Sequence, residues 1–242
     1  MNNTIHSRAE WDTLTNDQLP FFLFTEQVKA TMPIQDCGEP LVHLQPFFAQ
    51  RQSHIRCTAG LADYGARTTD MYLRPGAANR LLQAEQKLAE LSNHTLSLQL
   101  TDSYRPISLQ RQYFNDVKQK LAATGVHGQK LYRQITRVIA DPDTCPPHST
   151  GGVVDLTIYA IASEQPIDMG TAIDDIDNEL IDTFHPNVPP LVRQHRQLLF
   201  TVMITAGFVN TAAEWWHYSY GDQEWALRTR QPQALYGSVL EI

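Results

Sequence analysis

The sequence contains few cysteines. Cys37, Cys57 and Cys145 are the only three among 242 residues, and they are widely spaced, with no Cys-x-x-Cys pair. An odd number of separated cysteines is not the pattern of a disulfide-stabilised secreted domain. The sequence therefore argues against a disulfide framework and favours the reducing cytoplasm as its compartment.

Long apolar runs are also missing. The most apolar early stretch, Leu19 to Phe24, is far shorter than the roughly 20 residues that a membrane-spanning helix needs. The first residues, Met1 to His6, lack the basic region and apolar run of a secretory signal. We therefore expect a soluble protein that is not exported and has no membrane partner.

The sequence contains fewer basic than acidic residues. Nineteen Lys and Arg residues against 26 Asp and Glu residues give a formal net charge of -7, and no cluster of Lys and Arg forms the stripe that binds a phosphate backbone. Nucleic acid is therefore not an expected partner. A hydrophobic content of 42% over this length can bury a substantial core, so we expect one compact domain of unspecified oligomeric state.

The first 60 residues lack stretches long enough for extended helices, because proline recurs there at Pro20, Pro33, Pro40 and Pro46. We expect residues 1–60 to form an N-terminal segment, of unclear role, that packs on the domain formed by residues 61–242.

Beyond residue 60, apolar residues recur at the spacings of helices and strands. Helices are expected over residues 75–91, 108–124, 129–139 and 190–206, with Ser108 as the cap of the second. The last of these helices should face inward through Leu191, Leu198, Val202 and Ala206. Strands are expected over residues 95–100, 153–159 and from about 214 onward. This mixture predicts an α+β fold with a small antiparallel sheet flanked by helices.

Two residues near the middle of the chain are of metal-binding type. His148 and Asp155 stand seven apart in Pro-His-Ser-Thr-Gly-Gly-Val-Val-Asp. Prolines stiffen the loop that carries His148, Asp155 falls on the following strand, and the two glycines between them allow the backbone to fold closely. Catalytic zinc takes three ligands of the His, Asp, Glu or Cys type and keeps a position for water.

A second motif, Glu-Trp-Trp-His at residues 214–217, can complete such a site. His217 can be the third ligand, and Glu214 can be the general base that takes the proton of the attacking water and hands it to the leaving amine. Residues three apart on a straight strand face opposite sides. We therefore expect a turn, a bulge or the start of a strand at Glu214, with Trp215 and Trp216 in the core.

Other residues remain alternatives. Cys145, His185 and His195 could each replace one of the three ligands, although a neutral thiol is the usual state of a buried cysteine and His195 lies within an expected helix. Arg105 follows the strand that ends near residue 102, and taken alone it is typical of a surface cation.

Four motifs occur together in the order and approximate spacing of the zinc D-alanyl-D-alanine dipeptidases. They are Ser-Tyr-Arg-Pro (103–106), the residues from His148 to Asp155, Asp-Met-Gly-Thr-Ala-Ile-Asp (168–174) and Glu-Trp-Trp-His-Tyr (214–218). Over residues 72–236 the sequence resembles that family, which is best known from vancomycin resistance and shares its fold with zinc D,D-carboxypeptidases and the hedgehog signalling domain.

The resemblance implies a single-domain fold of that kind and one zinc ion per chain. It implies zinc ligands at His148, Asp155 and His217, with Glu214 as the general base. It further implies that Arg105 stabilises the oxyanion formed at the scissile carbonyl, and that Asp174 receives the free ammonium group of a dipeptide substrate.

Two features depart from the family pattern. Pro146 stands where the family usually has a serine that helps to hold the substrate ammonium, and Leu61 to Asp70 lacks the family's Asn-Phe-containing segment. Hydrolysis of D-Ala-D-Ala or a closely related dipeptide is the leading hypothesis. The alternatives are a D,D- or L,D-carboxypeptidase acting on peptidoglycan stem peptides, and a non-catalytic binding module stabilised by zinc.

Overall fold

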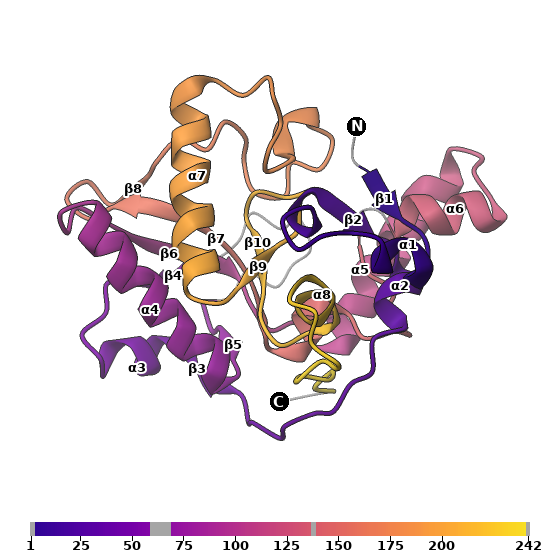
Figure 1. Cartoon of the computed structure of the whole chain (residues 1–242), viewed down its shortest axis with the longest axis horizontal. Coiled ribbons are helices and arrows are strands. Elements are labelled where there is room, and N and C mark those ends of the chain that lie inside the picture. The colour runs from indigo at the N-terminus through magenta and orange to yellow at the C-terminus, as the bar shows by residue number, and fades with distance from the viewer. Residues whose placement is uncertain (1–2, 59–68, 137–138, 241–242) are drawn as a thin grey trace.

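The computed structural model describes residues 3–58, 69–136 and 139–240 (Figure 1). Its main sheet has the strand order β4-β6-β7-β10-β9, and a short strand, β8, pairs with one end of β7. These strands are β4 (Arg56–Cys57), β6 (Leu96–Asp102), β7 (Val153–Ala160), β8 (Gln165–Pro166), β9 (Val209–Asn210) and β10 (His217–Ser219). All their pairings are antiparallel except that of β4 with β6. The expected α+β class is confirmed. The sheet also contains one parallel pair at its edge, which the sequence did not predict because β4 has only two residues.

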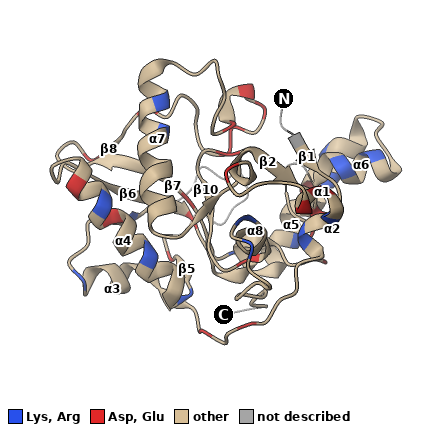
Figure 2. Ribbon diagram, viewed as in Figure 1, with Lys and Arg blue, Asp and Glu red and all other residues tan. Residues whose placement is uncertain are grey.

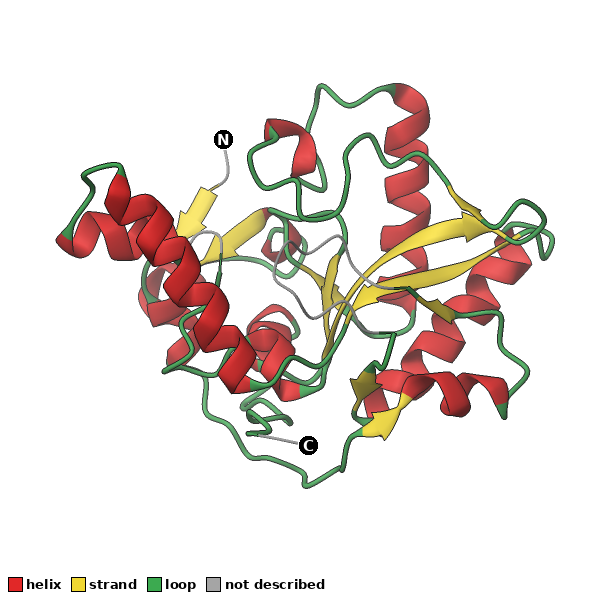
Figure 3. Cartoon of the chain, turned by 180° about the vertical axis from the view of Figure 1, so that it is seen from behind, coloured by secondary structure: helices red, strands yellow, loops and turns green. Residues whose placement is uncertain are grey.

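Two long helices cover one face of this sheet. In Figure 1, α4 (Pro75–Leu91) and α7 (Pro190–Thr205) lie in front of the strands, and in Figure 3, seen from behind, the strands lie in front of the helices. The apolar face expected for α4 is buried at Leu81, Ala84 and Leu88, whereas Leu91 at the end of the helix is 51% exposed. The expectation for Leu191 is wrong: its side chain is 58% exposed, and Val192 is the buried residue of the first turn of α7.

Two further helices form a hairpin beside the sheet (Figure 3). They are α5 (Ile107–Ala123) and α6 (Gly128–Ile135), and they share a small apolar cluster of their own. Ser108 does not cap α5, because that helix begins at Ile107 and its N-cap residue is Pro106. The third expected helix, over residues 129–139, corresponds to α6, which ends at Ile135 with Thr136 as its C-cap. Residues 137–138 of the expected range lie outside the described residues.

The N-terminal residues form only short elements, as their prolines required. Strand β1 (Asn3–Ile5) pairs with β2 (Phe22–Phe24), and β3 (Val42–His43) pairs with β5 (Tyr72–Leu73). The short helices and 3₁₀ turns of the molecule are α1 (Arg8–Asp12), η1 (Leu19–Phe21), α2 (Glu26–Ala30), α3 (Leu44–Ala49), η2 (Pro147–Thr150), η3 (Glu179–Ile181) and α8 (Gln223–Arg228).

The two ends of the chain share one hydrophobic core. Trp11 is buried there, and its indole N–H donates to the carbonyl of Leu227 at 3.2 Å. The buried guanidinium of Arg228 in α8 donates to the carbonyls of Leu19 and Phe22. The boundary expected between residues 60 and 61 lies outside the described residues.

In Figure 2, Lys and Arg are spread over several helices, among them α4, α6 and α7. Within the described part of the chain, no helix combines the length and the apolar composition that crossing a membrane would require.

Candidate metal centre and active site

The pairing of β7 with β10 brings two site residues together. Its register places His217 opposite Asp155, and residues that face each other in an antiparallel pair project from the same side of the sheet. The adjacent pair, Tyr218 and Val154, projects from the other side into the main core, where both side chains are fully buried. Strand alternation thus separates the site from the core.

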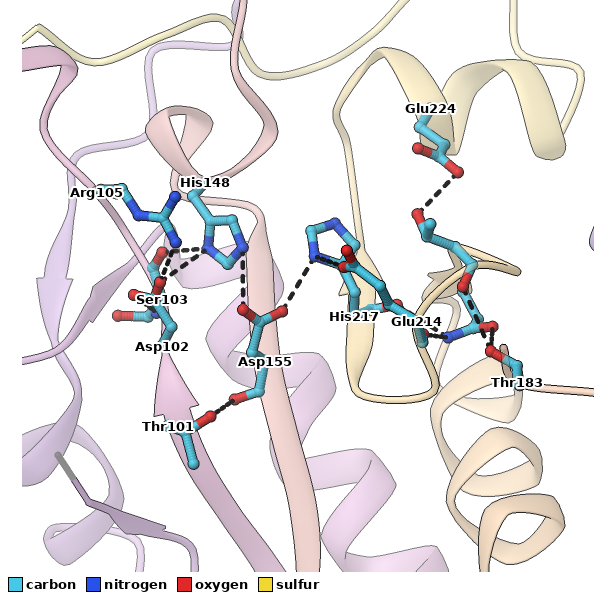
Figure 4. Close-up of polar contacts among 12 residues, drawn as sticks. Thr101, Asp102, Ser103, Arg105, His148, Asp155, Thr183, Glu214, His217 and Glu224 are labelled. Atoms are coloured by element: carbon cyan, nitrogen blue, oxygen red, sulfur yellow. Dashed lines mark hydrogen bonds and ion pairs between the residues drawn. The ribbon is translucent and has the colours of Figure 1, made fainter. Parts of the chain in front are cut away.

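His148 reaches the same place from the 3₁₀ turn η2, which leads into β7. Its Nδ1 lies 2.8 Å from the carbonyl oxygen of Ser103. A carbonyl can only accept a hydrogen bond, so Nδ1 carries a proton, and in a neutral imidazole Nε2 is then the nitrogen with the lone pair. That Nε2 faces Oδ2 of Asp155 at 3.3 Å (Figure 4). Hydrogen bonding therefore presents the correct nitrogen to a metal ion.

The three ligand atoms offered by His148, Asp155 and His217 lie within 4.8 Å of one another. All three side chains are buried, and they line the wall of an open cleft. Burial, mixed nitrogen and oxygen donors and one open side are the features of a catalytic metal site. The group contains none of the alternative ligands Cys145, His185 and His195.

Electrostatics favour a cation at this point. Burial alone would raise the pKa of Asp155, but the charge and hydrogen bonds of His148 and His217 outweigh it and hold that pKa well below its usual range. For His217, burial acts to lower the pKa, whereas the hydrogen bond and charge of Asp155 raise it to about 9. The negative charge that raises the pKa of His217 would also attract a metal cation.

Glu214 lies in a turn between β9 and β10, as its spacing from His217 required. Its Oε2 is 3.7 Å from Nδ1 of His217, so both side chains face the cluster (Figure 4). Burial raises the pKa of Glu214, and the opposing charge of His217 does not cancel that increase. A raised pKa makes a carboxylate a stronger base, so Glu214 is suited to accept a proton beside these candidate metal ligands.

Arg105 follows β6, where a shift in register between Leu100 and Asp102 marks a bulge. Bulges commonly re-aim side chains beside active sites. The guanidinium of Arg105 forms an ion pair with Asp102 and donates to Oε1 of Gln110 at 2.9 Å. Sequence reasoning missed both partners, although Asp102 ends the strand that was expected to deliver Arg105.

Asp174 and Pro146 line the same cleft. Loss of hydration, together with repulsion from Asp155 and Asp102, raises the pKa of Asp174 to about 7. Asp174 itself is an exposed residue. Most of the Leu61–Asp70 segment, residues 61–68, lies outside the described residues.

Trp215 and Trp216 are core residues, as expected, with 2% and 1% of their surfaces exposed. The indole N–H of Trp215 also donates to the hydroxyl of Thr171 at 2.8 Å. This bond joins the turn that carries Glu214 to the loop that carries Asp174.

Comparison with known proteins identifies the family. The model of the family described as D-ala-D-ala dipeptidase matches residues 73–234, close to the 72–236 over which the motifs suggested a resemblance. The chain belongs to this peptidase family. Its sequence is 34% identical over 238 residues to the D-alanyl-D-alanine dipeptidase of Synechocystis sp.. This match covers 86% of this chain and 95% of the relative. A shorter match to the D-alanyl-D-alanine dipeptidase of Enterococcus faecalis has 32% identity over 76 residues and covers 31% of this chain and 37% of that one.

Among solved structures, VanYB in complex with D-alanine-D-alanine has a TM-score of 0.43 at 14% identity and covers 67% of this chain and 80% of its own. The LdcB LD-carboxypeptidase has a TM-score of 0.42 at 15% identity and covers 81% of this chain and 74% of its own. Membership of the dipeptidase family makes this chain a metallopeptidase.

Proposed function

We propose that this chain is a cytoplasmic zinc dipeptidase that hydrolyses D-Ala-D-Ala or a closely related dipeptide. The observation that carries the proposal is the buried group of His148, Asp155 and His217, with Glu214 beside it in an open cleft. One zinc ion per chain fits this donor set, because two imidazoles and a carboxylate form a common catalytic zinc site. The low cysteine content supports the compartment.

In the proposed reaction, zinc bound by these three side chains would lower the pKa of water and polarise the substrate carbonyl. Glu214 accepts the proton that the water loses during attack and passes it to the leaving amine. Arg105 places a fixed positive charge where the carbonyl oxygen becomes negative, and this stabilises the transition state more than the ground state. Asp102 and Gln110 hold the guanidinium in that orientation.

Asp174 is the proposed acceptor of the substrate's free ammonium group. A bound ammonium would lower the pKa of Asp174 and keep the carboxylate ionised. Pro146 supplies no side-chain donor or acceptor at the cleft wall, so recognition of the amino end depends more heavily on Asp174. An acylated amino end would lose this ion pair, and we therefore expect free dipeptides to be preferred.

The test is the release of free D-alanine from D-Ala-D-Ala by the zinc-loaded protein. We expect Glu214→Gln to retain zinc and to lose about 10²–10⁴-fold in turnover. Arg105→Ala should keep zinc and lose about 10²–10³-fold in kcat. Loss of zinc from the Arg105 variant would count against its proposed role.

One observation favours a second candidate, a carboxypeptidase acting on peptidoglycan stem peptides. The cleft continues from the metal cluster along α5, where Leu109, Tyr113 and Val117 line it, and this leaves room for a longer peptide. No D-alanine from the dipeptide, but release from a stem peptide by the zinc-loaded protein, would replace the dipeptidase proposal with this one. If the zinc-loaded protein hydrolysed neither the dipeptide nor the stem peptide, a non-catalytic binding module would be favoured.

A further inference from the structure

Asn210 lies at the end of β9, and its side chain is 3% exposed. Its Nδ2 donates one hydrogen bond to the carbonyl of Glu214 and another to the carbonyl of His217, each at 3.0 Å. The two N–H bonds of one amide nitrogen therefore bridge the backbone of the proposed base and that of a proposed ligand. Sequence reasoning did not identify this residue.

The orientation of the Asn210 amide is determined by the two carbonyls. They can only accept hydrogen bonds, and a flipped amide would place Oδ1 against both of them. The hydroxyl of Thr183, another buried side chain, donates to Oδ1 of Asn210 at 2.7 Å (Figure 4 shows Thr183 beside the turn). Thr183 thus holds the opposite end of the amide in place.

Backbone bonds to neighbouring segments also hold the turn from Thr211 to His217. Trp215 N donates to the carbonyl of Ile181 and Leu156 N to that of Trp216, each at 3.1 Å, and Thr183 N donates to that of Ala212 at 3.0 Å. Within the turn, backbone bonds run from Thr211 N to the carbonyl of His217 at 3.2 Å, from Glu214 N to that of Thr211 at 3.1 Å, and from His217 N to that of Glu214 at 3.4 Å. The last is long, so the Asn210 amide provides the shortest bond to each of the two carbonyls it contacts.

We propose that Asn210, held in place by Thr183, is a positioning residue that sets the separation between the Glu214 carboxylate and Nδ1 of His217. The inference rests on the proposed function for the identities of base and ligand. Partners that orient metal ligands or bases matter because small displacements at a reacting centre cost much of the rate. Asn210 acts through the backbone of both residues.

The experiment compares Asn210→Asp and Thr183→Val with wild type, since each keeps the side-chain shape and removes donors to the turn or to the amide. Zinc dissociation constants are measured by competition with a chromogenic chelator, and kcat and KM on D-Ala-D-Ala at saturating zinc. Thr183→Ser restores the hydroxyl. Thr157→Val is the matched control, because the Thr157 hydroxyl on β7 is buried and has no hydrogen-bond partner in the described structure.

We expect Asn210→Asp and Thr183→Val to weaken zinc binding and to lower kcat at saturating zinc, each by about 10–100-fold, with KM changed less than about twofold and with Thr183→Ser and Thr157→Val close to wild type. A merely structural role would lower the melting temperature but leave the zinc dissociation constant and kcat of the folded protein unchanged, and that result would overturn the proposal.

The two proposals fail in different ways. Wild-type protein without dipeptidase activity would refute the proposed function, and the zinc dissociation constants would then decide the role of Asn210. Tenfold weaker binding in Asn210→Asp, reproduced by Thr183→Val and reversed by Thr183→Ser, supports positioning. Equal affinities refute it. If Asn210→Asp does not fold, the Thr183→Val and Thr183→Ser pair gives the same decision.

Discussion

At the scale of single residues, Gly152 controls how closely the strands of the site approach. A Cβ atom at this position would lie 2.1 Å from the carbonyl oxygen of Tyr220 and 2.7 Å from the ring of Tyr236. The Gly152 carbonyl also accepts a hydrogen bond from the Tyr220 N–H at 2.9 Å. Only a residue without a side chain keeps this contact, which continues the pairing of β7 with β10.

We expect Gly152→Ala to lower the free energy of unfolding by about 2 kcal/mol or more, because overpacking against backbone cannot be relieved by a side-chain rotation. Urea denaturation measures the change. Gly125→Ala is the control, since a Cβ there meets open space and adds only the strain of a positive φ. Equal losses in the two variants would contradict the close-approach argument.

Glu224 is a buried carboxylate held by cations. It accepts hydrogen bonds from Arg228 and Thr211 and lies 3.7 Å from Lys29. Burial opposes ionisation, but the charges of Arg228 and Lys29 lower the pKa of Glu224 from 4.5 to about 2. Because the folded-state pKa is the lower one, the stabilisation is complete above about pH 4.5 and is lost as the pH falls toward about 2.

The predicted contribution of Glu224 is on the order of 3 kcal/mol, at 1.36 kcal/mol per pKa unit. Glu224→Gln should therefore reduce the free energy of unfolding at pH 7 and flatten its decline in acid, so that the curves of variant and wild type converge near the low end of that range. Denaturant unfolding across pH gives both curves. Parallel curves would show that Glu224 does not titrate as described.

At the scale of elements, α7 holds the loop that carries Asp174. The buried guanidinium of Arg196 donates from Nε to the carbonyl of Met169 at 2.9 Å, and from Nη1 to those of Leu180 and Asp182 at 2.8 and 2.9 Å. Both ends of the loop are thus fastened to one side chain. Burial lowers the pKa of Arg196 to about 10, which leaves it charged at neutral pH.

Arg196→Met keeps much of the side-chain volume but removes these three bonds. We expect the loop to become more susceptible to limited proteolysis, and KM for the dipeptide to rise by about tenfold with a smaller change in kcat. Gln194→Met, at an exposed position of the same helix, is the control. An unchanged KM would show that this loop does not contribute to substrate binding.

At the scale of the whole molecule, the proposed zinc site joins elements that are far apart in sequence. His148, Asp155 and His217 come from a 3₁₀ turn, β7 and β10, and a ligand that binds only the folded chain stabilises all of it. Bound zinc should therefore raise the melting temperature of the entire domain.

With free zinc at about 1,000 times its dissociation constant, the stabilisation is about 4 kcal/mol, or roughly 10 °C for a chain of this size. Calorimetry with and without a chelator measures it. His148→Ala should melt at one temperature under both conditions. A wild-type melting temperature that is the same with and without the chelator would contradict the zinc site.

Local chemistry explains why much of this protein could be predicted from its sequence. Helix α4 and strand β6 follow from apolar spacing, β7 follows from its β-branched and aromatic residues, and the turn at Glu214 follows from the three-residue distance to His217. Residue type and spacing determine secondary structure through interactions among near neighbours in the chain, so these elements can be predicted from the sequence.

The polar residues around the candidate site could be identified only from the fold. Residue types and their spacing predicted the α+β class and the candidates His148, Asp155, Glu214 and His217, because ligand type and strand period are local properties. They did not indicate the bulge before Asp102, the buried Arg196 or the Asn210 amide, since each depends on partners that only the fold brings together. A buried polar side chain is recognised by the hydrogen bonds that satisfy it, and those bonds exist only in three dimensions.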